Sequence, residues 1–458
     1  RVAHVFGQPQ DIEWAIENGA LYLLQARPIT ALSETVDPDG ARCLWDNSNI
    51  VESYAGVTSA LTFSFARRAY EEVYRKFCRL MRVPEGKIAA HDRTFRCMLG
   101  LIDGRVYYNL LSWYRVLALL PGFTLNRGFM EQMMGVRERL DASLLPARRP
   151  ATVRAQLRDG ADLLVTLAAL ILNLFRLPRR TAEFRRLLEA ALAPSDPPLE
   201  DLRPDELSEY YRGLERRLLT RWDAPVVNDF FAMIFFGVLR RLTERWCGER
   251  GTLHNDLLSG DAALISAEPA RRMQEMAKIA AGTALASKLR DGTLDAILDT
   301  MEEVPAFAAL YRGYLERFGE RCMDELKLES LTLHEEPLPL LRTVGRLADR
   351  IAALDREPRA NQDGGRRADA ERRLREALAG RPARRLALLW VLHQARARIR
   401  DRENLRFERT RLFGRVRQIF LEFGRRFSSL GLLDDPRDVF HLEVEEILGF
   451  VEGTGTST

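Results

Sequence analysis

The sequence predicts a mainly α protein, a large irregular helical domain preceded by a short β-hairpin. The hairpin is indicated by two runs of alternating β-formers on either side of Asn18-Gly19, a strong turn signal. From Phe65 onwards, apolar residues recur at the spacing of a helix that buries one face. No sequence period of about 20 to 50 residues repeats convincingly, so we do not predict a solenoid.

The hairpin, residues 8–30, admits two registers that predict different chemistry. A two-residue turn at Asn18-Gly19 pairs Glu13 with Leu24. A three-residue loop, with the glycine in the left-handed conformation, pairs Glu13 with Leu23 instead. Only the second register places the polar residues of both strands together, because side chains alternate along a strand.

In that second register, Glu13, Gln25 and Arg27 share one face of the hairpin. A carboxylate and an amide oxygen are hard ligands for Mg²⁺, and a guanidinium forks onto phosphate oxygens. The arrangement therefore suits a metal–polyphosphate site. The alternative is an ordinary edge hairpin whose polar residues are solvated.

Composition and charge bound the function classes. The net charge is +4, and acidic residues are interspersed with the basic ones, so we predict no nucleic-acid partner. The five cysteines are scattered and odd in number, without a Cys-x-x-Cys pair: Cys43, Cys78, Cys97, Cys247 and Cys322. This usage argues for reduced thiols in the cytoplasm and against a disulfide or zinc framework.

Residues 8–30 also carry a family resemblance. The strand Gln10-Asp-Ile-Glu-Trp14, a turn, and the strand Leu24-Gln-Ala-Arg-Pro-Ile-Thr30 resemble the end of the ATP-grasp domain in the phosphoenolpyruvate synthase and rifampicin phosphotransferase group of dikinases. The resemblance implies ATP and Mg²⁺ as cofactors. It makes Glu13 and Gln25 metal ligands and Arg27 a phosphate contact.

A second segment, residues 45–64, is similar to a structured loop of the same group. Its small polar residues indicate a loop that feeds a helix capped near Thr62 or Ser64. The resemblance makes Asn49, Glu52 and Thr58 candidates for an acceptor or interdomain site, with loop capping as the alternative.

The helical part contains one candidate membrane segment, the apolar run Leu163–Phe175. It has 13 residues, whereas a spanning helix needs about 20. We predict no membrane partner and a helix buried on most of its surface. The cluster Met130, Met133 and Met134 predicts either core packing or an adaptable apolar pocket.

Two charged segments complete the candidate sites. Arg321 and Glu325 follow a helix and are placed by the resemblance near the acceptor or the transferred phosphoryl group, or else form a structural charge network. A last long helix is predicted from about Arg384 to Leu430. Its charge-rich run, residues 396–411, resembles an Arg-Glu-x-x-Arg helix of the group, or is a solvated face with paired charges.

By the same resemblance, catalysis proceeds by relay: ATP phosphorylates a histidine on a swivelling domain, which carries the phosphoryl group to a small-molecule acceptor. That histidine lies in a Thr-Ser-His-Ala-type loop. None of the six histidines has these neighbours: His4, His91, His254, His334, His393 and His441. We therefore expect a fragment of a longer parent, inactive alone, with no catalytic residue. His254 and His334 are proton carriers or, more commonly for such lone histidines, structural.

The predicted organisation has four segments: residues 1–32 as the last strands of an ATP-grasp domain, 33–64 as linker and loop, 65–452 as an all-helical acceptor-binding domain, and 453–458 as the start of a linker to the swivelling domain. The predicted function is phosphoryl transfer from ATP, yielding AMP and phosphate, to pyruvate or to a hydroxyl of a larger apolar molecule. The alternative is a non-catalytic helical small-molecule-binding protein with a degenerate nucleotide domain.

Overall fold

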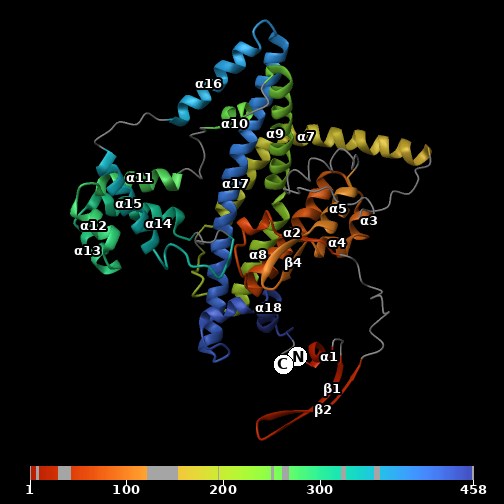
Figure 1. Cartoon of the computed structure of the whole chain (residues 1–458), viewed down its shortest axis with the longest axis vertical. Coiled ribbons are helices and arrows are strands. Elements are labelled where there is room, and N and C mark those ends of the chain that lie inside the picture. Colours follow the sequence, from red (N-terminus) through yellow and green to blue (C-terminus); the bar gives the residue numbers. More distant parts are fainter. Residues whose placement is uncertain are drawn as a thin grey trace. The chain divides into compact units, whose positions relative to one another are not determined.

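A computed structural model describes residues 2–6, 10–28, 43–120, 153–193, 195–248, 252–259, 268–320, 326–354 and 362–455. The chain divides into two compact units, Arg1–Leu44 and Trp45–Thr458, which are described separately. Helices dominate, and the described residues form two small sheets, so the predicted mainly α fold with an N-terminal hairpin is confirmed (Figure 1).

The first unit contains α1 (Val2–Phe6) and an antiparallel hairpin of β1 (Gln10–Glu17) and β2 (Ala20–Pro28). The turn has two residues: Asn18 and Gly19 have φ values of 49° and 78°, as a type I′ turn requires. Of the two alternatives, the three-residue loop is therefore excluded.

The register expected from the two-residue turn holds only from the turn to Trp14, because the pairing shifts between Trp14 and Glu13. Glu17 pairs with Ala20 and Trp14 with Leu23, but Glu13 then pairs with Gln25. One residue of β2, Leu24, has no partner of its own and forms a bulge. The bulge shifts the pairing by one residue and decides which side chains share a face.

The second unit begins with a three-stranded antiparallel sheet in the order β3-β5-β4, made of β3 (Trp45–Asp46), β4 (Leu99–Ile102) and β5 (Arg105–Asn109). A Cβ on Gly100 would lie 2.4 Å from Cζ3 of Trp45, so a residue without a side chain is needed there. The short η2 (Ile50–Glu52) follows β3. Around the sheet lie α3 (Glu85–Ala89), α4 (Asp92–Arg96) and α5 (Leu110–Ala118).

Three helices form the centre of the second unit: α2 (Ala60–Leu80), α9 (Asp223–Cys247) and α17 (Pro382–Ser429). Helices α9 and α17 run side by side, and α2 packs against α9 (Figure 1). The cap of α2 is Ser59, whose hydroxyl accepts from the Thr62 backbone N–H at 3.3 Å, so a start at Thr62 or Ser64 was wrong. Helix α17 agrees within two residues with the predicted span.

The remaining helices complete two packing groups. One surrounds α9 and α17, and comprises α7 (Val153–Ala191), α8 (Pro204–Leu218), η4 (Leu219–Arg221), α10 (Leu253–Leu258), α16 (Gln362–Ala377), η6 (Pro436–His441) and α18 (Val444–Glu452). The other is a bundle beside α17, made of α11 (Glu268–Ala280), α12 (Ala284–Asp291), α13 (Leu294–Glu302), α14 (Pro305–Phe318) and α15 (Leu338–Leu354) (Figure 1). This bundle has its own core, into which α17 inserts Phe407 against Phe318.

The apolar run in α7 is not buried as predicted. Leu164 and Phe175 are 69% and 76% exposed, whereas the polar Thr166 and Asn173 are buried. By length and composition, the described helices include one stretch, Pro204–Cys247, that is apolar enough to cross a membrane. Half of its most apolar window is buried within the unit, as is usual for a core helix.

Candidate functional site

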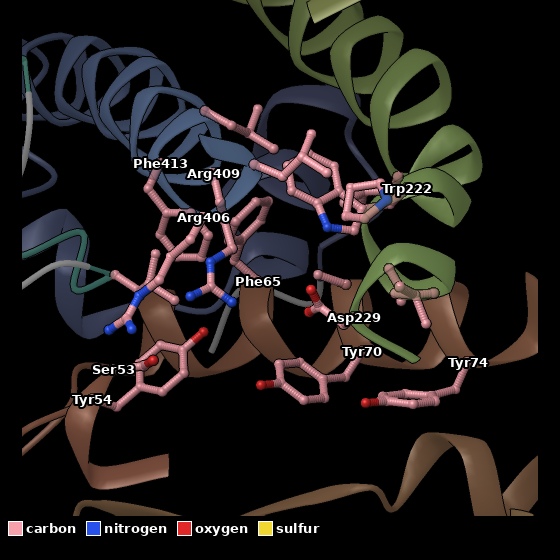
Figure 2. Close-up of a pocket in the computed structure, with 18 of the residues that line it drawn as sticks. Ser53, Tyr54, Phe65, Tyr70, Tyr74, Trp222, Asp229, Arg406, Arg409 and Phe413 are labelled. Atoms are coloured by element: carbon pink, nitrogen blue, oxygen red, sulfur yellow. The ribbon is translucent and has the colours of Figure 1, made fainter. Parts of the chain in front are cut away.

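A cavity of about 270 Å³ lies between α2, α9, α17 and the loop that follows β3 (Figure 2). Each helix contributes residues at helical spacing, which puts them on one stripe. Helix α2 provides Tyr70 and Tyr74, and α17 provides Arg402, Arg406 and Arg409. The three central helices thus converge on one space whose walls differ sharply in chemistry.

One wall is aromatic. The hydroxyl oxygens of Tyr70 and Tyr108 lie 3.2 Å apart and share a hydrogen bond. The Trp113 ring packs edge-on against Tyr74 and Tyr108, at centroid distances of 4.5 and 5.6 Å. Burial raises the pKa of the Tyr74 and Tyr108 hydroxyls well above their ordinary value, so both stay neutral and act as hydrogen-bonding groups on an apolar surface.

The opposite wall is charged. Figure 2 shows Arg406 and Arg409 projecting from α17 toward the space where Asp229 of α9 and Tyr54 also point. The Arg402 Nε lies 3.9 Å from the Asp229 carboxylate. Three guanidinium groups along one helix form a strong site for an anion, and phosphate oxygens match their fork geometry.

The loop that closes the cavity is fixed by a single carboxylate, that of Glu329. It accepts hydrogen bonds from the Ser59 N–H at 3.1 Å, the Ser59 hydroxyl at 2.8 Å and the Thr62 hydroxyl at 2.6 Å. Nearby, Lys327 Nζ donates to the Ala55 carbonyl at 3.0 Å. These bonds hold residues 49–59, and hence one edge of the cavity, against the segment 326–330.

The residues predicted from the sequence for an acceptor or interdomain site lie in different places in the structure. Asn49 and Glu52 line the cavity. Thr58 is buried away from the lining, and its N–H donates to the Gly104 carbonyl at 2.7 Å. Arg321 and Glu325 lie outside the described residues, as does the methionine cluster at 130–134.

The two histidines considered as proton carriers lie elsewhere than the cavity lining. His254 is buried, with its ring edge-on to Phe236 at 5.4 Å, and burial lowers its pKa. His334 Nε2 lies 3.7 Å from a carboxylate oxygen of Glu320. Neither histidine lines the cavity, so the structure gives neither of them a place beside an acceptor bound there.

Sequence reasoning missed the aromatic wall and Asp229. One signal was available: Arg402, Arg406 and Arg409 follow the helical stripe of the apolar Leu405, Leu412 and Phe413, so they face inward with them. The tyrosines come from α2 and β5, and no local pattern shows that these elements meet.

The hairpin of the first unit presents its own polar face. Because of the bulge, Glu13 lies directly opposite Gln25, and Asp11 opposite Arg27, so all four side chains share one face. Arg27 Nη2 donates to Gln25 Oε1 at 2.7 Å. This face contains the three residues predicted from the sequence, together with Asp11, which was not predicted.

The donor set of this face suits Mg²⁺ in one specific way. Among the described residues, no group of three or more His, Cys, Asp or Glu side chains converges to enclose a metal ion. Mg²⁺ is ordinarily held by one or two carboxylates with phosphate oxygens and water completing its shell. Asp11 and Glu13 fit that pattern, and Arg27 lies on the same face, where a guanidinium could contact phosphate oxygens.

Two family models match the chain, one over the hairpin and the other over part of the cavity lining. Residues 1–42 match "Pyruvate phosphate dikinase, AMP/ATP-binding domain", and residues 224–403 match "Rifampicin phosphotransferase fourth domain". These matches support a member of the PEP-utilizing enzyme family. The polar face of the hairpin falls within the nucleotide-binding match, and Asp229 and Arg402 fall within the other.

Curated relatives of this PEP-utilizing family member agree. A rifampicin phosphotransferase from Streptomyces sviceus is 23% identical over 474 residues, covering 97% of this chain and 49% of the relative. One from another Streptomyces is 24% identical over 468 residues with the same coverage. A probable phosphoenolpyruvate synthase from Methanothermobacter thermautotrophicus is 51% identical over 37 residues, 8% of this chain. The chain spans about half the length of the rifampicin phosphotransferases it matches.

Proposed function

We propose that this chain serves a dikinase-type phosphotransferase that moves a phosphoryl group from ATP, by way of a phosphohistidine, to a hydroxyl of an apolar small molecule. The acceptor binds in the cavity of the second unit. The observation that carries this proposal is the pairing of an aromatic wall with three arginines across one cavity. The aromatic wall matches an apolar acceptor, and the arginines match a phosphoryl group.

Two observations favour a large acceptor over pyruvate. Pyruvate is small and polar, and it would leave most of the aromatic wall, which includes Tyr74, Trp113 and Trp222, without a partner. In addition, the rifampicin phosphotransferases align with nearly the whole chain, whereas the matched phosphoenolpyruvate synthases align with short segments.

The residues have separate tasks in this proposal. Arg402, Arg406 and Arg409 hold the phosphoryl oxygens as charge moves onto them during transfer, which is the usual electrostatic contribution in such reactions. On the hairpin, Asp11 and Glu13 are the candidate carboxylate ligands, and Arg27 contacts nucleotide phosphates. Mg²⁺, when bound there, neutralises the phosphate charge of ATP. A phosphohistidine domain, as part of the same parent protein, delivers the phosphoryl group.

Calorimetric titration of the chain tests the acceptor. Rifampicin, whose aromatic core carries hydroxyl groups, should bind with that core in the cavity and the rest of the molecule outside it, and pyruvate should not displace it. The variant Ala69→Trp places a large ring in the cavity lining and should abolish binding, whereas Ala387→Trp on the exposed surface of α17 should not. Binding of pyruvate but not rifampicin, or binding unaffected by Ala69→Trp, would overturn this acceptor assignment.

A further inference from the structure

Asp229 is a carboxylate in the cavity wall whose ion pair with Arg402 is long. Its side chain is half accessible, and the accessible part faces the cavity. Its nearest ion-pair partner, Arg402 Nε, is 3.9 Å away, beyond hydrogen-bonding distance. Within the described part of the chain, no hydrogen bond to this carboxylate is found, so its oxygens are accessible to a molecule in the cavity.

The groups that face Asp229 come from two neighbouring helices. They are Arg402, Glu403, Arg406 and Arg409 on α17, and Tyr70 and Tyr74 on α2. Burial raises the Asp229 pKa to about 6, and the three arginines oppose that rise. Asp229 is therefore ionised at neutral pH, yet it is a stronger base than an ordinary aspartate.

Other lining residues suit proton acceptance less well. Among the described residues of the lining there is no histidine, and the one other carboxylate is that of Glu52, on the exposed segment after β3. The tyrosines Tyr74 and Tyr108 are neutral hydroxyls whose basicity is negligible. Asp229 lies on a rigid helix beside the arginines that are proposed to hold the phosphoryl group.

We propose that Asp229 is the base that takes the proton of the acceptor hydroxyl during phosphoryl transfer. This role rests on the proposed function. The acceptor oxygen forms a bond to phosphorus while the bond between phosphorus and the histidine nitrogen of the donor breaks, and that nitrogen keeps the electron pair. The hydroxyl proton passes to the Asp229 carboxylate, which later releases it to solvent. Such a base contributes roughly a hundredfold or more to rate.

A fluorescent phenol tests this role directly on the full chain. In its excited state 2-naphthol gives its proton to an adjacent base and then emits at longer wavelength as naphtholate. Its binding can be followed separately by quenching of Trp113 and Trp222, which line the cavity. The variants are Asp229→Asn and the matched control Asp223→Asn, an aspartate on the same helix outside the lining.

The expected result has three parts. The wild-type chain and Asp223→Asn bind the probe and emit as naphtholate at neutral pH, and this emission is lost as the pH falls through about 6. Asp229→Asn binds the probe with similar affinity but emits mainly as neutral naphthol, without that pH transition. Ala69→Trp loses both signals, which locates the probe in the cavity.

Two contrary results are distinguishable. If the probe binds and Asp229→Asn retains the naphtholate emission and its pH transition, the role of Asp229 is refuted while the acceptor cavity stands. If the wild-type chain does not bind the probe, or if Ala69→Trp still binds it, the proposed function itself fails. The unfolding midpoint of each variant confirms that a lost signal is not lost folding.

Discussion

The substitution Asp229→Asn should make the chain more stable at neutral pH, although it removes a charge from the proposed site. In the folded chain Asp229 keeps its proton up to about pH 6, whereas in the unfolded chain it loses its proton near the ordinary value of 3.8. Folding therefore takes up a proton between these values, and the wild-type chain loses stability as the pH rises through this range. Asparagine does not titrate and escapes this loss.

The size of the effect follows from the shift in pKa. A rise from 3.8 to about 6 is about 2 units, and at 1.36 kcal/mol per unit this is at most about 3 kcal/mol. Half of the side chain is accessible, so water in the cavity screens the charge and reduces the expected gain to about 1 kcal/mol. The gain should be near zero below about pH 4, where both side chains are neutral.

Urea unfolding at pH 4 and pH 7.5, followed by far-ultraviolet circular dichroism, measures this difference. The control is Asp299→Asn, because Asp299 is exposed on α13 and does not line the cavity. A stability gain that appears equally at both pH values, or a loss at pH 7.5, would refute the argument that desolvation raises the pKa of Asp229.

Three further predictions concern other contacts. In the intact protein, Glu13→Ala should reduce ATP-dependent AMP formation roughly 10- to 100-fold, because a contact to a charged group is lost. The control Glu17→Ala, on the same hairpin face, should leave the rate unchanged. Equal rates for both variants would remove the hairpin from the nucleotide site. Glu329→Ala should cost about 2 kcal/mol in urea unfolding, because it leaves the cap of α2 without its acceptor, whereas Glu336→Ala, at an exposed position, should cost little. Arg417→Gln should cost about 2–4 kcal/mol at pH 7, because the buried guanidinium donates to the Ser330 carbonyl and to the Glu335 carboxylate. Partial burial raises the Glu335 pKa, but the hydrogen bond from the Thr332 backbone N–H and the charge and hydrogen bond of Arg417 outweigh it and lower that pKa. The cost should therefore shrink as acid protonates this carboxylate, and a cost independent of pH would contradict the pairing.

Sequence patterns within one segment predicted helix α17 and the N-terminal hairpin, because both depend on residues close together in the chain. The span of α17 follows from its uninterrupted helical period, and Gly431, with φ of 72°, ends it as the sequence indicates. The hairpin follows from the Asn18-Gly19 turn. The register did not, because a bulge at Leu24 costs little locally and leaves no signal in the residues.

The apolar run of α7 shows the converse failure. An apolar helix was predicted to be buried on most of its surface, yet its burial depends on which neighbours reach it. In the described residues, the packed side includes Thr166 and Asn173, while Leu164 and Phe175 are exposed. Composition gives the amount of apolar surface in a segment but not the side on which another element packs.

The sequence by itself determined the class of fold, the presence of the hairpin and the family resemblance, because these depend on short motifs and on periodicities within one element. Only the tertiary structure decided where the cavity lies. Its walls come from segments as far apart as Tyr54 and Phe413, and their meeting depends on how α2, α9 and α17 pack. The raised pKa of Asp229 has the same origin, since desolvation is a property of the surroundings that a folded chain supplies.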